Sequence, residues 1–145
     1  PTIVSVARTS DGVRLRVEGR ATLRESACVA AFADGALAGG ARVVVDLRGC
    51  SYVDSTFLGS LVSLHKHAAA TGGRYAIAVT PEDRRMLFGV TGLDEVLVLV
   101  DEPPPATTTD TPLCVPAVGS GEELGRHVME CHRRLAELGG PQADA

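Results

Sequence analysis

Two adjacent hydroxyl side chains, Ser55 and Thr56, follow Asp54 in the stretch C-S-Y-V-D-S-T-F-L-G (50–59). A hydroxyl can cap a helix by accepting a backbone N–H, and it can also accept a phosphoryl group from a kinase. The stretch lies where an apolar run ends and a helical pattern begins, which is where caps are common. The tripeptide alone leaves open whether these hydroxyls are structural or are acted upon.

Helical spacing assigns different roles to the two hydroxyls. At about 100° per residue, one face collects Leu58, Leu61, Val62, His65, Ala68 and Ala69. Thr56 and Ser60 fall on the opposite side, so the spacing predicts that they point to solvent. Ser55 stands at the natural N-cap position, where its oxygen would accept a backbone N–H. We therefore expect Ser55 to be structural and Thr56 to have no structural role.

The elements that position this stretch follow from hydrophobic periodicity and from turn and capping residues. The predicted strands are 3–7, 13–19, 41–47, 74–80 and 95–100, and the predicted helices begin at Thr22, at about 56 and at Pro81. The run 41–47 is continuously apolar, which is typical of a central strand buried on both faces. Strands and helices alternate from there on, which predicts parallel pairing through right-handed crossovers. We expect an α/β domain over residues 1–100, with a mixed sheet and helices on one face.

The remainder of the chain is predicted to lie outside this domain. Residues 101–118 are rich in Pro and Thr and predict an extended linker. Residues 119–139 predict an amphipathic helix, and 140–145 a tail. The helix has an apolar stripe at Leu124, Val128, Cys131, Leu135 and Leu138. The sequence leaves open whether this stripe packs on the domain or on a partner.

Composition excludes several classes of protein. The net charge is −4 with mixed signs, whereas a nucleic-acid surface needs a basic patch. No apolar run reaches the roughly 18 residues of a membrane span, and the N-terminus lacks the pattern of a signal peptide. We expect a cytoplasmic protein that binds neither nucleic acid nor membrane, with its four cysteines as free thiols.

Catalytic and metal-binding patterns are weak. His65 and His67 fall on opposite sides of one predicted helix, and His127 with Cys131 offers only two ligands. Asp46 and Asp54 follow an apolar strand, so a small-ligand or nucleotide-binding enzyme is one alternative. We expect instead that Asp46 supports the loop and that Asp54 faces a partner. The sequence predicts no enzyme, no cofactor and no metal.

Three segments together resemble the STAS domain family, named for sulphate transporters and anti-sigma factor antagonists. V-V-V-D-L-R-G-C-S-Y-V-D-S-T-F-L-G-S-L-V (43–62) is similar to the family signature of an Asp-Leu strand end followed by Asp-Ser-Ser/Thr-Gly-Leu-Gly. T-G-L-D-E-V-L-V-L (91–99) resembles the second marker, and V-R-L-R-V-E-G-R-A-T (13–22) the N-terminal strand with its glycine. The resemblance covers residues 1 to about 100 and implies a small mixed sheet with helices on one face.

The resemblance also implies a function, because free-standing bacterial members act as switches. An anti-sigma factor that is itself a Ser/Thr kinase binds the domain around this loop and helix. It phosphorylates the second hydroxyl of the motif, here Thr56, with Ser55 as the second candidate. The unphosphorylated antagonist holds the anti-sigma factor and frees sigma, and the phosphorylated form lets go. A phosphate on Thr56 would sit at a helix N-terminus that favours anions, so we expect the fold to tolerate it and an interface not to.

Some residues depart from the family pattern. Phe57 replaces the usual glycine and is either a docking hot spot or an obstacle to the kinase. Arg20-Ala-Thr22 replaces the common Glu-Leu-Asp. The predicted partner-binding residues are Asp54, Ser55, Phe57 and Ser60. The alternative is a non-phosphorylated STAS scaffold module in a larger signalling complex, and other STAS proteins and a homodimer are further candidate partners.

Overall fold

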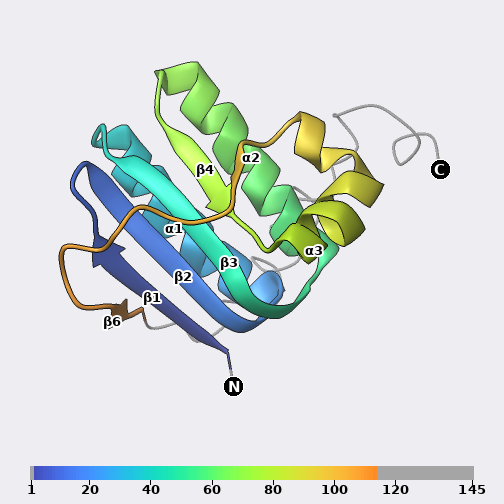
Figure 1. Ribbon diagram of the computed structural model, residues 1–145. Helices are drawn as coiled ribbons and strands as arrows, with labels where there is room; N and C mark the ends of the chain where they lie inside the picture. Colours follow the sequence, from blue (N-terminus) through green and yellow to red (C-terminus); the bar gives the residue numbers. More distant parts are fainter. Residues whose placement is uncertain (1, 114–145) are drawn as a thin grey trace.

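The computed structural model describes residues 2–113. The domain is built on a six-stranded sheet. The strands are β1 (Ile3–Arg8), β2 (Gly12–Ala21), β3 (Arg42–Val53), β4 (Tyr75–Ala78), β5 (Leu99–Val100) and β6 (Thr111–Pro112). The helices are α1 (Leu23–Ala38), α2 (Ser55–Thr71) and α3 (Pro81–Asp83), which continues into a π-helical turn (Arg84–Gly89). The spatial order is β5-β4-β3-β2-β1-β6, and Figure 1 shows the helices gathered on one face.

The strand pairing confirms the predicted mixed α/β sheet. β1 and β2 form an antiparallel hairpin, closed by the Thr9 N–H, which donates to the Gly12 carbonyl. β2, β3, β4 and β5 are mutually parallel, as expected for strands joined by helical crossovers. Because β2 pairs with both β1 and β3, the hairpin and the parallel strands belong to one sheet.

Alternation along β3 divides the sheet into a core face and a second face. Val43, Val45 and Leu47 point into the main core beneath the helices. Val44 lies on the other face, where a smaller buried cluster forms with Ala76 and Ala78. Aliphatic side chains dominate both clusters, as the scarcity of aromatic residues requires.

The predicted strand at 95–100 is wrong in its extent. A 3-10 turn occupies Leu93–Glu95, and only Leu99–Val100 pairs with β4 as a strand. Leu93 and Leu97 are both buried, and four residues is the spacing of a helical turn rather than of a strand. Burial of these two leucines therefore delays the start of the last parallel strand.

The first part of the predicted linker, 101–118, is built into the sheet. Figure 1 shows residues 101–110 crossing in front of β3 and β2, on the side away from the helices. Asp110 then pairs with Arg14 and Arg16, each at 3.1 Å, and β6 joins the edge of β1. A Pro-rich sequence has no periodicity that would reveal such long-range contacts. Residues 114–118, the helix predicted at 119–139 and the tail 140–145 lie outside the described residues.

Within residues 2–113, the helices are too short or too polar to cross a membrane.

Candidate functional site

The candidate site is the junction between the end of β3 and the start of α2, which lies beside the junction between β2 and α1. β3 runs beyond its apolar run to Val53, which pairs with Ala21 of β2. Two register irregularities accompany this extension, and Gly19 at one of them has a φ of +100°, a conformation that favours glycine. Because the parallel strands end together, the N-termini of α1 and α2 begin side by side.

Asp54 caps both of these helices. Its Oδ1 accepts the Phe57 N–H at 2.8 Å within α2, and its Oδ2 accepts the Leu23 N–H at 3.0 Å at the start of α1. The predicted N-cap, Ser55, is instead the first residue of α2. A carboxylate has two acceptor oxygens and serves two helices at once, which a hydroxyl cannot do as well. Asp54, predicted to face a partner, thus has a structural role.

Replacing Asp54 with alanine is expected to lower the free energy of unfolding by about 2 kcal/mol, about 1 for each helix that loses its cap. Asp54→Asn keeps one acceptor oxygen and should lose about half as much. Urea denaturation of both variants measures this, with Ser55→Ala as the matched control. A Ser55→Ala loss as large as that of Asp54→Ala would contradict this assignment of the cap.

Thr56 and Ser60 do not point to solvent, so this prediction is wrong. Their exposed fractions are 4% and 2%. For Ser60, the reason is that α1 packs along this side of α2, where Ser26 of α1 and Ser60 share a hydrogen bond between their hydroxyls. The side of α2 that the spacing assigned to water is therefore the contact between the two helices.

Phe57 is fully buried in the main core, with Leu61 and Leu64. A side chain in this position cannot contact a partner at the surface, so the predicted docking role of Phe57 does not fit the fold. The departure from the family glycine instead adds a large aromatic residue to the core.

Ser51, Tyr52 and Ser55 are exposed at the junction, and the exposed fraction of Tyr52 is 46%. The guanidinium of Arg20 lies 4.4 Å from the centre of the Tyr52 ring, a cation–π contact. Arg24 is also exposed, in the first turn of α1. Sequence reasoning missed Tyr52 because it ended the strand at Leu47. Extending the alternation of β3 through Val53 would have found it.

Asp46 lies on the sheet face away from the helices and is 2% exposed. Both of its oxygens accept hydrogen bonds from the Arg48 guanidinium, at 3.0 and 3.2 Å, and Arg16 lies at 3.4 Å. Burial alone would raise the pKa of Asp46, but these bonds and the charges of Arg48 and Arg16 hold it below its ordinary value. Asp46 and Asp54 are therefore engaged in separate contacts and do not form a carboxylate pair.

The remaining candidate ligands are occupied or inert. Cys50 is free, and its thiol donates to the Val17 carbonyl at 3.2 Å. Burial raises the pKa of Cys50 to about 12, which suppresses thiolate chemistry. His67 pairs with Asp34 through Nδ1 at 2.7 Å. Among the residues that the structure describes, no group of three side chains could hold a metal ion.

Comparison with solved structures finds the same fold. An anti-sigma factor antagonist from Mycobacterium paratuberculosis matches with a TM-score of 0.60 and 16% identity, over 70% of this chain and 87% of that one. The anti-sigma factor antagonist SpoIIAA in its unphosphorylated form matches with a TM-score of 0.57 and 20% identity, over 68% and 89%. The phosphorylated form of this Bacillus cell fate determinant gives 0.55 and 20%, over 68% and 92%.

Comparison at the level of sequence gives the family. None of the curated proteins matches this chain. The family model STAS_2, described as "Mlab, STAS domain", matches residues 4–101, which is more than half of the chain and contains both the Asp54 motif and the predicted second marker. The protein is thus a member of the STAS domain family.

Proposed function

We propose that this STAS domain is an anti-sigma factor antagonist. In the proposed cycle it binds an anti-sigma factor Ser/Thr kinase in the cytoplasm while unphosphorylated, and phosphorylation within Ser55–Thr56 releases it. The observation that carries the proposal is the Asp-Ser-Thr motif at the start of α2, in a fold shared with solved anti-sigma factor antagonists. The role is regulatory and involves no catalysis by this chain.

The exposed part of the junction supports a docking surface made of Arg20, Tyr52 and Ser55. An aromatic ring stacked with an arginine is the kind of residue pair that dominates many protein interfaces. These residues take the place of Phe57 and Ser60, which are buried. A phosphate at Ser55 or Thr56 would add about −1.5 to −2 charges beside this surface, which an interface would have to desolvate.

The family motif assigns the phosphate to Thr56, and Ser55 is the second candidate. Thr56 is 4% exposed in the first turn of α2, so a kinase could reach it only after this turn opens. Ser55 is exposed without any rearrangement. SpoIIAA has been solved in both unphosphorylated and phosphorylated forms, so that protein accepts a phosphate on the same fold.

Intact-mass analysis after incubation with ATP and anti-sigma kinases from the same organism tests the proposal. We expect one added phosphate that persists in Ser55→Ala and disappears in Thr56→Ala. Loss in Ser55→Ala alone would move the acceptor to the exposed hydroxyl and leave the function standing. No phosphate with any kinase, together with no binding to any, would overturn the proposed function.

A second candidate is a non-phosphorylated STAS scaffold module, and the burial of Thr56 favours it. In that case the domain binds an assembly, another STAS protein or a second copy, and its hydroxyls serve only to pack α2. Binding to a partner that is unchanged by ATP and unchanged in Thr56→Ser would identify this candidate. Binding that ATP abolishes would identify the switch.

A further inference from the structure

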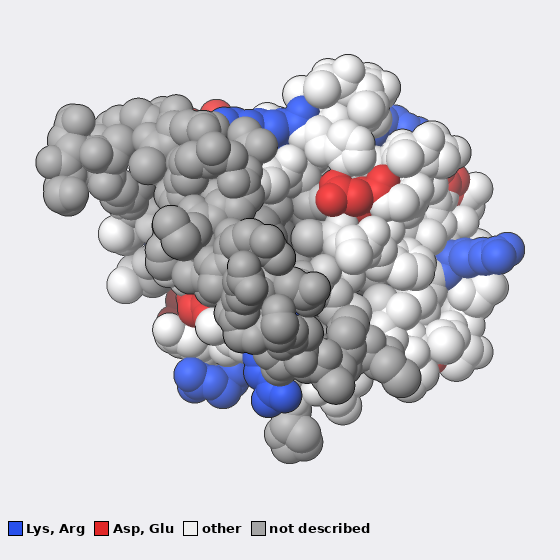
Figure 2. Space-filling view, turned by 180° about the vertical axis from the view of Figure 1, so that it is seen from behind, with Lys and Arg blue, Asp and Glu red and all other residues white. Residues whose placement is uncertain are grey.

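Beyond its first turn, the outer surface of α1 carries few of the polar residues that a solvent-facing helix normally has. Between Ala27 and Ala38 the helix has one charged residue, Asp34. The residues exposed on this stretch of the helix are otherwise small and uncharged, namely Ala27, Ala31, Gly35 and Ala38. A helix that is apolar on every side is usually covered on every side. Figure 2 shows the helix face, whose described part is mostly uncharged, with charged side chains toward its margins and one acidic patch.

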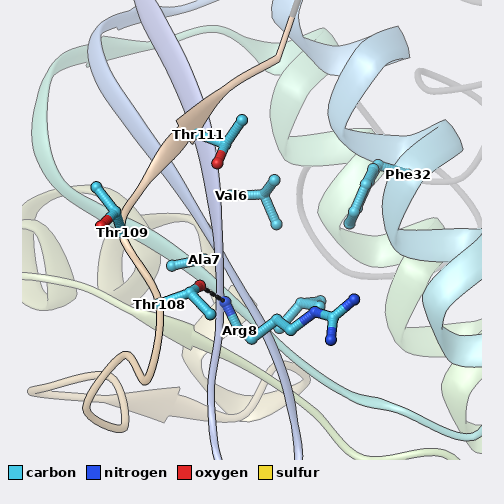
Figure 3. A pocket seen from close by; sticks show the side chains of 8 residues that line it. Val6, Ala7, Arg8, Phe32, Thr108, Thr109 and Thr111 are labelled. Carbon is cyan, nitrogen blue, oxygen red and sulfur yellow. Dashed lines mark hydrogen bonds between the residues drawn. The ribbon is translucent and has the colours of Figure 1, made fainter.

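A groove runs beside this surface. A cavity of about 350 Å³ lies between β1 and Phe32 and is also lined by Thr108, Thr109 and Thr111. A second cavity of about 510 Å³ follows α1 past Ala31 and Gly35. Phe32 and Val13 line both, so the two form one groove. Figure 3 shows Phe32 of α1 and Val6 of β1 on opposite sides of the first cavity.

The last described residues of the chain, 111–113, lie beside this groove. Thr111 of β6 lines the first cavity, and the Leu113 N–H donates to the Val4 carbonyl of β1 at 2.8 Å. Residues 114–119 can span about 20 Å when extended. Behind them comes the predicted helix, with its apolar stripe at Leu124, Val128, Cys131, Leu135 and Leu138. The apolar segment that needs cover therefore starts within reach of the apolar surface that lacks it.

The lengths also agree. A helix over residues 121–138 would be about 27 Å long, and α1 with its 16 residues is about 24 Å long. Alanine and glycine on the outer side of α1 would let the axis of a second helix approach to about 8–10 Å. Arg8 is the charged residue among those that line the groove, so most of the lining suits an uncharged stripe.

We propose that the segment 120–138 of this chain docks as a helix on the outer side of α1, with its stripe over Phe32 and Ala31. The C-terminal segment then adds a further layer to the domain over α1. Its apolar face packs on the domain and is not available to a partner. This proposal does not depend on the function proposed above.

Hydrogen exchange measured by mass spectrometry on the full chain tests the docking. We expect the amides of 124–138 to be protected in the wild type. They should exchange at least about tenfold faster in Ala31→Asp, which places a carboxylate on α1, and in Val128→Asp, which places one in the stripe. Ala69→Asp is the matched control, because Ala69 is an exposed alanine on α2, and it should leave 124–138 unchanged. Protection of β3 in every variant would show that the domain stays folded.

Two results would overturn the proposal. Fast exchange of 124–138 in the wild type would mean that the segment does not dock at all. The second is a dimer in light scattering that Ala31→Asp converts to a monomer, while the protection of 124–138 does not change. In that case a second copy of the chain, and not its own C-terminal segment, covers α1.

Discussion

Replacing Phe57 with alanine is expected to lower the free energy of unfolding by about 3–5 kcal/mol, the usual cost of removing a large buried aromatic side chain. Phe57 is fully buried and is among the largest side chains of the core. Its loss would leave a cavity under the first turn of α2, where the chain can collapse only in part. Urea denaturation measures the loss.

Tyr52→Ala is the matched control for Phe57, since it removes an aromatic residue of the same stretch that is exposed and stacks on Arg20. We expect this variant to cost less than about 1 kcal/mol of stability and to weaken binding of a partner. A Phe57→Ala protein of normal stability that had lost its partner would restore Phe57 as a docking residue. It would also mean that the first turn of α2 is exposed in solution.

Thr56→Glu, the usual imitation of a phosphate, is expected to destabilise the fold by about 3 kcal/mol or more. The sequence led us to expect a phosphate at this position to be tolerated, but the side chain is 4% exposed in the first turn of α2. A glutamate there must either bury a charge or displace the groups packed around it, and each is costly. The favourable field of the helix N-terminus returns only about 0.3–1 kcal/mol. Thermal unfolding followed by circular dichroism measures the effect.

The control for Thr56→Glu is Ser55→Glu, which places the same charge at an exposed position in the same turn. It should change stability by less than about 1 kcal/mol. If both glutamate variants melt at the wild-type temperature, the first turn of α2 opens readily and a kinase could reach Thr56. If only Thr56→Glu is destabilised, loss of partner binding in that variant cannot be attributed to charge alone.

Much of the fold could be predicted from sequence because it depends on neighbours in the chain. The hairpin follows from the alternating strands on either side of the turn residues S-D-G (10–12). The first helix begins with a capping box, in which Thr22 is the N-cap and Glu25 accepts the Thr22 N–H. Gly72 ends α2 with a φ of +68°, and the segment T-G-G (71–73) is typical of the end of a helix. The continuous apolar run 41–47 predicted a central strand, because such runs are typical of strands covered on both faces. The structure confirms this, since β3 pairs in parallel with β2 and β4.

The sequence predicted that the Asp-Ser-Thr motif lies where a strand is followed by a helix, but it did not predict which way the side chains of this helix point. Helical spacing gives the angles between residues, but it does not say which side of the helix meets the sheet and which meets another helix. α2 is apolar around much of its circumference in its first turns, at Phe57, Leu58, Leu61, Val62 and Leu64. The packing of α1 buries Ser60 beside Ser26, and Thr56 and Phe57 of the first turn are buried as well.

Two contacts join residues that are far apart in the sequence and could not be predicted from local patterns. Asp54 caps α1 as well as α2 because parallel pairing of β2 and β3 brings Leu23 beside it, across 31 positions of the sequence. Asp110 holds the Pro-rich segment on the sheet by pairing with Arg14, 96 positions away. The sequence by itself determined the family, the order of the elements and the place of the motif, because these depend on local patterns. Burial and partners depended on which distant surfaces meet, and only the tertiary structure decided them.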